Sequence, residues 1–443
     1  MKILIAAFCG IFSVVLAQNT PKLTISQCLD VALENNLELK MQKINMAVTS
    51  SQIFQSKMNY LPNLNANYNY GRQFGTVFAA AGAIRVDQTV DFSGFNLNSS
   101  LNLFNGFANY YNYKRNLAQL SAQNEGSKRI VNNLVTNIMF QFLLLVGDEA
   151  NIDVTNKRIE TLNNQKERLQ KLAEAGVIDG SELFNINAQI AEEQSNLILQ
   201  QNRFAQNKLI LLQLMNVEDE NVDFVIPDVN ETMVTGYLLP DLSDVEAYAL
   251  ENMPEISEQR LNLKVSQWNT KISRAAYYPS LAFNANISSN YSSFRSPFQT
   301  EVSPYFAQMK NNFQQFVGIG LNIPIFNALQ VRTNVQVQKL REQMADIAIK
   351  NAVNTLRRSV RSAYLDAKQA QATYAAVKKQ VEAATQAFNL IESRYAAGTQ
   401  NFYNYLDALN TKTNAETRLN FSRYDFYFKL KLLDVYRGNE VAF

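Results

Sequence analysis

Histidine is absent from this chain of 443 residues, and cysteine occurs only as Cys9 and Cys28. Without histidine the chain lacks the commonest general base, proton shuttle and metal ligand in proteins. No other nucleophile, base or metal-binding constellation replaces it, so we expect neither an enzyme nor a cofactor. Cys28 is the only cysteine beyond the N-terminal apolar run, which excludes an intramolecular disulfide framework. Stability must therefore come from packing and assembly.

Long apolar runs are also scarce. Met1-Lys2 precedes an apolar run from Ile3 to Leu16 that ends in the small-residue step before Gln18, the pattern of a cleaved secretory signal peptide. We expect residues 1–17 to be that signal peptide. The run is shorter than the ~20 residues that span a bilayer, and Cys9 follows the bulky Phe8, which argues against lipid attachment.

The charge of the chain is nearly balanced, with 41 basic and 39 acidic residues. The densest basic group, Arg357, Arg358 and Arg361, is spaced as one side of an exposed helix, which indicates a solvated face rather than nucleic-acid binding. Beyond the N-terminus the longest uninterrupted apolar stretch runs from Phe142 to Val146, so we expect no transmembrane helix. If the chain enters a membrane, it must do so with strands.

The chain contains an internal duplication. Ala32-Leu33-Glu34-Asn35 recurs at 249–252, and Tyr60-Leu61-Pro62 recurs as Tyr277-Tyr278-Pro279, both 217 residues later. Phe104-Asn105 and Ala175-Gly176 recur 222 residues later. A register kept over roughly 150 residues indicates two copies of one large unit. We expect one repeat at 18–215, a connection rich in proline and acidic residues at 216–241, and a second repeat at 242–443.

Each repeat contains two segments with strict alternation of apolar and polar residues. In the first, Leu64, Ala66, Tyr68 and Tyr70 alternate with the asparagines at 63, 65, 67 and 69. The others cover 96–103, 281–288 and 317–325. Strands of about ten residues edged by aromatic side chains are typical of transmembrane β-barrels, although a soluble sandwich would show the same alternation. Four strands cannot close a barrel, so the barrel would be shared between protomers.

Two long intervals, from Phe104 to Gly176 and from Phe326 to Gly398, carry helical spacing. At 1.5 Å per residue each could reach on the order of 100 Å. A heptad seam runs along the second interval, and the first shows an imperfect copy of it that Lys166 interrupts. The seam residues are Val377, Val381, Ala384, Phe388, Ile391 and Tyr395 in the second copy and Ile159, Leu162, Leu169 and Ala173 in the first. The glycine turns precede predicted return helices at 181–214 and 402–433.

Together these features resemble the TolC-type outer-membrane efflux channel family. The resemblance covers essentially the whole mature chain and rests on the Tyr-Leu-Pro and Tyr-Tyr-Pro strand entries, Ile323-Pro324-Ile325-Phe326-Asn327 at the strand exit, and the turn Arg394 to Thr399. It implies an α+β fold of duplicated coiled-coil hairpins with four transmembrane strands per protomer. Three protomers would form one twelve-stranded β-barrel in the outer membrane of a Gram-negative bacterium and a periplasmic α-helical tunnel.

The resemblance also implies a function. Members are passive, gated ducts of tripartite efflux or type I secretion systems and perform no chemistry. The implied partners are two further copies of the chain, outer-membrane lipid, a periplasmic adaptor (membrane fusion) protein and an inner-membrane pump of the RND, ABC or MFS type; no nucleic acid is implied. The alternative is a trimeric, barrel-anchored structural or adhesive surface protein. Its outward segments would be long, whereas the candidates here, 71–94 and 289–312, are moderate.

The resemblance further implies a constriction and a latch near the turns. The two constriction positions fall on Asn404 and Asp407, of which only Asp407 is charged, so the acidic ring should be weaker than usual. Asp407 also fits an ordinary exposed helix residue. The latch tyrosine corresponds to Tyr395 and its acid to Glu182, beside the hydroxyl residue Ser181, while Gln400 replaces an arginine. Simple packing would explain Tyr395 equally well.

The turns themselves correspond to the tips that meet an adaptor in the family. These positions are Gly176 and Val177 in the first repeat and Gly398 and Thr399 in the second. A left-handed turn conformation explains glycine there just as well. Gly180 departs from the pattern and would loosen the first turn by about 1 kcal/mol relative to alanine.

Overall fold

The computed structural model describes residues 22–79, 84–176, 180–219, 221–225, 227, 229, 238–295 and 301–439. The predicted signal peptide at 1–17 lies outside these residues. The chain divides into two compact units. The helical unit takes in 1–40, 129–251 and 357–443, and the sheet unit takes in 41–128 and 252–356.

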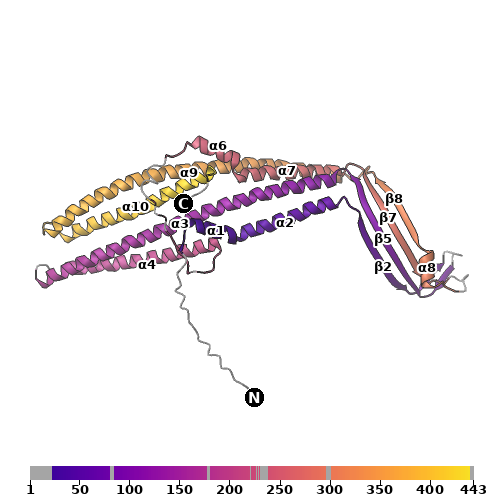
Figure 1. Cartoon of the computed structure of the whole chain (residues 1–443), viewed down its shortest axis with the longest axis horizontal. Helices are drawn as coiled ribbons and strands as arrows, with labels where there is room; N and C mark the ends of the chain where they lie inside the picture. Colours follow the sequence, from indigo (N-terminus) through magenta and orange to yellow (C-terminus); the bar gives the residue numbers. More distant parts are fainter. Residues whose placement is uncertain are drawn as a thin grey trace, which may run out of the picture. The chain divides into compact units, whose positions relative to one another are not determined.

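The long helices of the two halves have matching lengths. The pairs are α1 (Ile25–Asn35) and α6 (Leu242–Asn252) with 11 residues each, α2 (Leu37–Met58) and α7 (Pro254–Ala275) with 22, α3 (Ala108–Glu174) and α9 (Gln330–Ala396) with 67, and α4 (Ser181–Met215) and α10 (Phe402–Tyr436) with 35. In Figure 1, α3 and α4 form one hairpin and α9 and α10 form the other. Both return helices extend slightly beyond their predicted ends. Equal lengths in the same order are what duplication of one unit produces.

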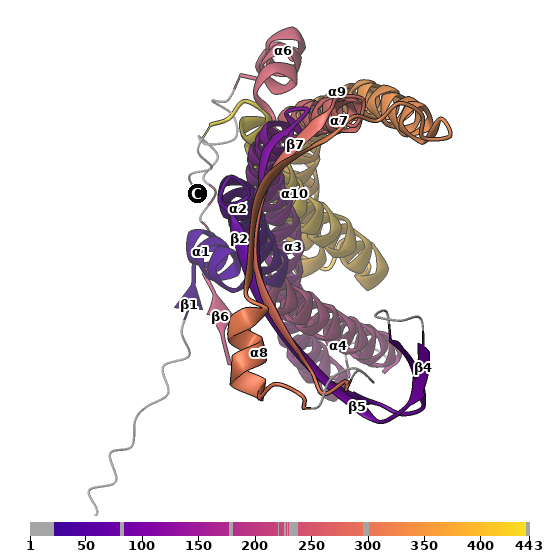
Figure 2. The same cartoon turned by 90° about the vertical axis from the view of Figure 1, so that its right-hand side faces the viewer.

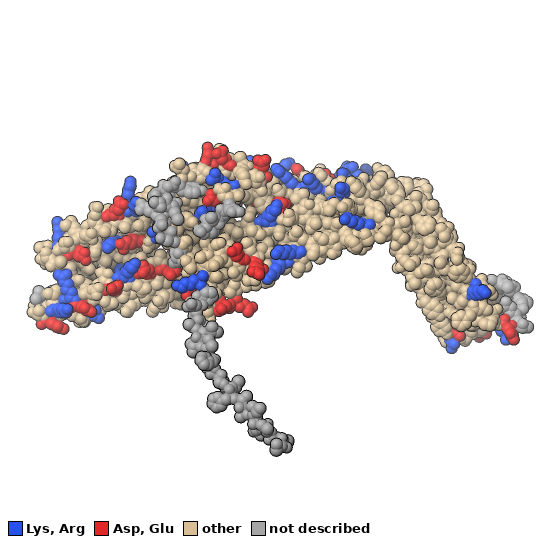
Figure 3. All heavy atoms as spheres, viewed as in Figure 1, with Lys and Arg blue, Asp and Glu red and all other residues tan. Residues whose placement is uncertain are grey.

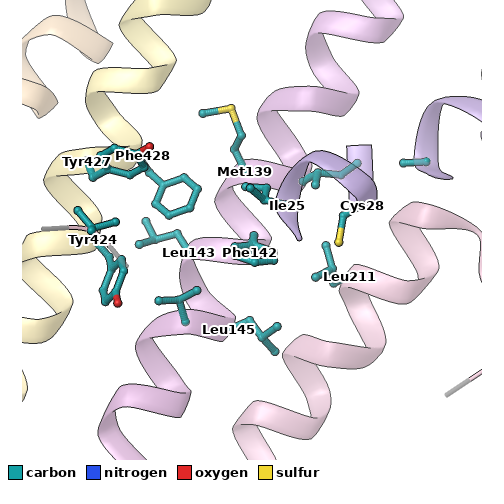
Figure 4. Close-up of a cluster of buried hydrophobic side chains, with 14 of the residues drawn as sticks. Ile25, Cys28, Met139, Phe142, Leu143, Leu145, Leu211, Tyr424, Tyr427 and Phe428 are labelled. Atoms are coloured by element: carbon teal, nitrogen blue, oxygen red, sulfur yellow. The ribbon is translucent and has the colours of Figure 1, made fainter. Parts of the chain in front are cut away.

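The core of the helical unit joins α1, α3, α4 and α10. Phe142 of α3, at 0 % exposure, lies among Ile25 and Cys28 of α1, Leu211 of α4 and Phe428 of α10 (Figure 4). The rings of Phe142 and Phe428 are 6.4 Å apart. Burial raises the pKa of the Cys28 thiol to about 12, so this cysteine is a packing residue rather than a reactive one.

Helix α3 also bears on the membrane question. It holds an 18-residue stretch that is apolar enough to cross a membrane by length and composition. The lengths of the uninterrupted apolar runs, from which we expect no transmembrane helix, do not indicate this stretch. Of that stretch, 56 % is buried within the protein. Because residues from Ile130 to Val146 supply much of the helical core, packing accounts for the apolar character of α3.

The main sheet has four antiparallel strands in the order β2 (Asn63–Gln73), β5 (Val90–Asn105), β7 (Ser280–Ser292) and β8 (Gln314–Asn322). Two small pairs accompany it, β3 (Thr76–Ala79) with β4 (Ile84–Asp87), and β1 (Lys22–Leu23) with β6 (Asp223–Phe224). The short helix α8 (Tyr305–Asn311) contacts β7. The prediction that β8 would continue to Ile325 is wrong: the strand ends at Asn322, just before Pro324, which has no N–H to donate.

The register of the sheet separates two faces. Asn65 pairs with Asn98, which in turn pairs with Asn286, while one step along Ala66 pairs with Leu97 and Leu97 with Ile287. Directly paired residues lie on the same face of a sheet, so the asparagines gather on one face and the aliphatic residues on the other. We call these the asparagine face and the apolar face. Figure 3 shows few charged atoms on the visible side of the sheet between its two ends.

Two phenylalanines break the pattern. Phe92 pairs with Gly71, and Phe316 pairs with Asn286, so both lie on the asparagine face. Each ring covers a glycine: a Cβ on Gly71 would lie 2.4 Å from the Phe92 ring, and one on Gly318 would lie 2.6 Å from the Phe316 ring. Glycine at these two positions therefore makes room for an aromatic ring above the backbone.

We expect Phe142→Ala to lower the free energy of unfolding by about 3–5 kcal/mol, because a buried aromatic side chain leaves a cavity. A denaturant titration of the detergent-solubilised protein followed by circular dichroism would measure the change. Phe184→Ala is the matched control, because Phe184 in the same unit is 77 % exposed. Equal loss of stability in both variants would contradict this assignment of the core.

Candidate gate at the hairpin tips

Each long hairpin turns on a glycine with a left-handed backbone. Gly176 and Gly398 both have φ of +72°, and their N–H groups donate to the carbonyls of Ala173 (3.0 Å) and Tyr395 (3.1 Å). The second turn is completed by Thr399, whose N–H donates to the carbonyl of Arg394 at 2.9 Å. This pair of bonds is the Schellman arrangement that ends many helices, and it requires a residue that tolerates positive φ. Val177, a predicted tip residue, lies outside the described residues.

The helices that leave the two tips begin differently. Asn401 caps α10, because its side-chain oxygen accepts the N–H of Asn404 at 2.9 Å. Gly180 precedes α4 and offers no side-chain cap. An asparagine cap stabilises a helix start by about 1 kcal/mol relative to alanine. The start of the second return helix is therefore held by a contact that the first lacks.

Next to the second tip, aromatic side chains from α9 and α10 form a group that we call the aromatic cluster. Its members are Phe388, Tyr395, Phe402 and Tyr405. The Tyr395 and Tyr405 rings stack with centroids 5.0 Å apart, and Phe402 lies 6.0 Å from Tyr395. Leu162 and Leu169 of α3, both fully buried, pack in the same core. The seam predicted on α9 is thereby confirmed.

The hydroxyl of Tyr395 is tied to α3. Gln165 Nε2 donates to it at 3.0 Å, and the guanidinium of Arg168 lies 5.6 Å from the ring centroid. Arg168 also donates to the carbonyl of Ala396 at 3.4 Å. Burial, and then the charge of Glu182, raise the pKa of Tyr395, so the hydroxyl stays protonated. The predicted acid is therefore close enough to act on the tyrosine through its charge, and the contact that fixes the hydroxyl comes from Gln165.

Gln165 corrects the expected seam on α3. The prediction placed Lys166 in the seam as an interruption, whereas the buried side chain there is Gln165, at 8 % exposure. The buried positions Leu162, Gln165 and Leu169 are separated by three and four residues. The heptad spacing is therefore continuous, and one of its positions is polar. A polar residue in a seam needs a partner, and Tyr395 provides it.

A hollow between α4 and α10 adjoins this cluster. Glu182, Asn185 and Gln189 line it from α4, and Leu406, Asp407 and Asn410 line it from α10. Both predicted acids, Glu182 and Asp407, therefore border the same space. Asn404 is not among the lining residues, and its side-chain amide donates to Gln400 Oε1 at 3.0 Å. Of the two predicted constriction positions, only the charged one faces the hollow.

One polar contact behind the hollow was not foreseen. Arg158 of α3 lies 3.1 Å from Glu193 of α4 and also donates to the side-chain oxygen of Asn410 on α10. The Arg158 and Glu193 side chains are only 10 % and 7 % exposed. This contact joins the two hairpins beside the hollow, because Asn410 lines it three residues beyond Asp407. No periodic pattern marks these residues, because none of them is apolar.

The sequence profile of the family described as outer membrane efflux protein matches residues 28–217 and 247–430. The chain belongs to this family. Among its relatives, the solvent efflux pump outer membrane protein SrpC of Pseudomonas putida is 21 % identical over 88 % of this chain and 80 % of its own length. Outer membrane efflux protein BepC of Brucella suis is 21 % identical over 87 % of this chain and 79 % of its own. This efflux protein is thus a transport component, and the adhesive alternative is not favoured.

Solved structures confirm the α+β fold. The CmeC outer membrane channel of Campylobacter jejuni superposes with a TM-score of 0.79 at 16 % identity, over 94 % of this chain and 85 % of CmeC. The open state of the MtrE outer membrane channel of Neisseria gonorrhoeae gives 0.73 at 19 % identity, over 94 % and 89 %. The efflux protein therefore has the fold of these outer-membrane channels.

The aromatic cluster should make the folded state less stable as the pH rises above about 10. Burial raises the pKa of Tyr405 to about 12, against about 10 for an unfolded tyrosine. Tyr405 therefore contributes stability that is complete below the unfolded pKa and is lost as pH rises towards the folded pKa. We expect the melting temperature of Tyr405→Phe, measured in detergent, to fall less steeply above pH ~10 than that of the parent protein. Tyr403→Phe, at a 76 % exposed site, should leave the fall unchanged; equal slopes in all three proteins would contradict the assignment.

Proposed function

We propose that the efflux protein is a passive, gated duct formed by three copies of the chain. The observation that carries this proposal is the two-faced sheet, in which β2 and β8 are the edge strands and have no outer partner strand among the described residues. The four strands alternate in direction, so β8 of one copy can pair antiparallel with β2 of the next. Open edges cannot remain in lipid, because each unpaired backbone group costs several kcal/mol there. Three copies supply twelve strands, with the asparagine face lining water and the apolar face against lipid.

The duplication supports the same assembly. We assign the first repeat to 18–215, the connection to 216–241 and the second repeat to 242–443, after a signal peptide at 1–17. The two family matches and the equal helix lengths agree with this division. Two hairpins per copy would give six around the axis, and the helices would then form the periplasmic tunnel. The signal peptide would direct the chain across the inner membrane.

The hollow near the tips is the proposed constriction. Glu182 and Asp407 border it in each copy, so a threefold axis would bring several carboxylates close together. Like charges in a narrow pore repel one another and attract cations. Asn404, bonded to Gln400, would add polarity without charge. We expect a cation-selective entrance with Asp407 as its principal charge.

The latch would hold α9 and α10 against α3. Its contacts are the Gln165–Tyr395 hydrogen bond, Arg168 over the Tyr395 ring, and Arg158 with Asn410. Glu182 and Ser181 lie at the start of α4, where the charge of Glu182 acts on Tyr395. In the family a second latch uses an arginine at the position of Gln400, and Gln400 cannot form its ion pair. Closure would therefore be held mainly by the contacts of Tyr395.

The tips are the proposed docking surface for a periplasmic adaptor. Gly176, Gly398 and Thr399 occupy the turns, Val177 follows Gly176 in the sequence, and the exposed side chains of Phe184 and Tyr403 lie a few residues further along the chain. The efflux names of the relatives support an adaptor and an inner-membrane pump of the RND, ABC or MFS type as further partners. Cysteines placed at Thr399 should crosslink to such an adaptor in cells.

Neutralising the constriction tests the duct directly. We expect Asp407→Asn, alone and with Glu182→Gln, to lower cation selectivity and block by multivalent cations in planar-bilayer recordings. Asp244→Asn removes an equal charge from an exposed position on α6, far from Asp407 in the sequence, and should change neither the cation selectivity nor the block. Selectivity unaltered in the double variant would sink the constriction assignment.

Loosening the latch should open the entrance. We expect Glu182→Ala with Tyr395→Phe to raise single-channel conductance, because the pair removes the hydroxyl and the charge that acts on it, and Gln165→Leu to do so because it removes the hydrogen-bond donor. Tyr60→Phe, at a 52 % exposed tyrosine that does not line the hollow, is the control. Conductance at the parent level in all variants would show that Tyr395 only packs.

A further inference from the structure

Helix α8 is fastened to one end of the sheet. The Tyr305 ring lies 4.9 Å from that of Tyr291 on β7, and its hydroxyl accepts from Ser93 of β5 at 3.3 Å and lies 3.4 Å from the Tyr68 hydroxyl on β2. Ser289 of β7 donates to the carbonyl of Met309 at 2.5 Å. Figure 2 shows α8 beside the strands. The helix therefore touches side chains from three strands.

A second set of contacts fixes the position of α8. The Gln308 side chain accepts the N–H of Ser292 at 3.1 Å and donates to the carbonyls of Ser292 (3.0 Å) and Ser303 (2.9 Å). The N–H of Asn312 donates to the carbonyl of Gln308 at 2.8 Å, which closes the last turn. The orientation of α8 is thus set by hydrogen bonds as well as by ring contacts.

The register assigns α8 to the apolar face. Ser93 pairs with Tyr70 and Tyr291, and Ser289 pairs with Phe95. These residues share the parity of Leu97 and Ile287 and not that of the asparagines. Ser93 and Ser289 are 2 % and 6 % exposed, so two small side chains make room for the helix where the face otherwise carries larger residues.

The outer side of α8 carries one aromatic and one basic residue. Phe306 is 84 % exposed, and Lys310, also exposed, follows it by four positions, so both lie on the same side of the helix. An exposed phenylalanine next to a lysine suits a boundary between hydrocarbon and anionic headgroups. In water alone, the Phe306 ring would gain only its edge contact with the Tyr305 ring, whose centroid lies 5.4 Å away.

The height of α8 on the sheet is near the end of such a band. From Asn63, the first residue of β2, to Tyr70 there are seven steps, which is about 23 Å along the strand or roughly 16–19 Å in height at a barrel tilt of 35–45°. The apolar band of a membrane barrel is about 25 Å tall and is bordered by aromatic girdles. Tyr68, Tyr70, Tyr291 and Tyr305 gather at this level, which marks it as the outer border of the band.

We propose that α8 is an interfacial anchor on the outside of the barrel, in which Phe306 inserts into the outer leaflet and Lys310 binds lipid phosphate groups. The partner is the lipid surface itself. This inference rests on the proposed function, since it requires the apolar face to meet lipid. It adds a membrane contact made by a connecting segment rather than by a strand.

Fluorescence quenching by lipid tests the anchor. Phe306→Trp is introduced into the full chain and reconstituted into vesicles of phosphatidylcholine and phosphatidylglycerol whose acyl chains are brominated near the headgroup. Trp268, the one native tryptophan, gives a constant background measured in the parent protein. We expect the emission of the tryptophan at 306 to lie at a shorter wavelength than in water and to be mostly quenched by the brominated lipid. Lys310→Gln should reduce that loss.

Two further tryptophans separate the possible failures. Ile319→Trp reports the apolar face of β8, and Phe316→Trp, 60 % exposed, reports the asparagine face. Quenching at 319 but not at 306 would overturn the anchor and leave the barrel standing. Quenching at neither 306 nor 319, or at 316 instead of 319, would overturn the proposed orientation of the sheet. Retained heat-resistant trimers on gels would show that each variant is folded.

Discussion

The register of the four-stranded sheet is the constraint on which the rest of the structure depends. Asn286 donates to both Asn96 and Asn98, and this bonding holds the asparagine rows of β5 and β7 side by side. A slip of one residue would exchange the two faces and place asparagine among aliphatic side chains. Because the register is fixed, the sheet has an asparagine face and an apolar face, and in the proposed barrel its outer strands β2 and β8 would pair with those of further copies.

Duplication supplies the framework, and departures from it supply the residues of the proposed gate. The helices of the two halves match in length, yet Tyr395 stands where the first copy has Ala173, and Asp407 where it has Asn185. The Tyr395 phenol and the Asp407 carboxylate are thereby placed on one hairpin, while Gln165, which donates to the phenol, and Glu182, a second carboxylate at the hollow, lie on the other. A contact between unlike hairpins can break without unfolding either of them. Strict repetition would have given each tip the same residues and no such pairing.

Features governed by local periodicity could be predicted from the sequence, and contacts between distant segments could not. Alternation located β2 and β7, and heptad spacing located the seam of α9, because both depend on neighbours within a few residues. Gln165 and Tyr395 are 230 positions apart, and only the fold brings them together. The polar group Arg158, Glu193 and Asn410 leaves no periodic trace. Helix α8 escaped notice because seven residues give less than two complete apolar repeats.

The polar contacts across the latch contribute only a modest part of the energetic cost of the proposed opening. Moving α10 away from α3 would break the bond between Arg158 and Asn410 but leave Arg158 paired with Glu193, so no buried charge would lose its counter-ion. A hydrogen bond to a charged group contributes about 1.5–3 kcal/mol, and a neutral one such as Gln165–Tyr395 about 1 kcal/mol. Turning a mostly closed population into a mostly open one takes about 5.5 kcal/mol of differential binding. The polar latch contacts are of the same order, but Leu162 and Leu169 of α3 are buried in one core with the aromatic cluster, so an adaptor that favours the open tips must also offset the apolar surface that opening exposes.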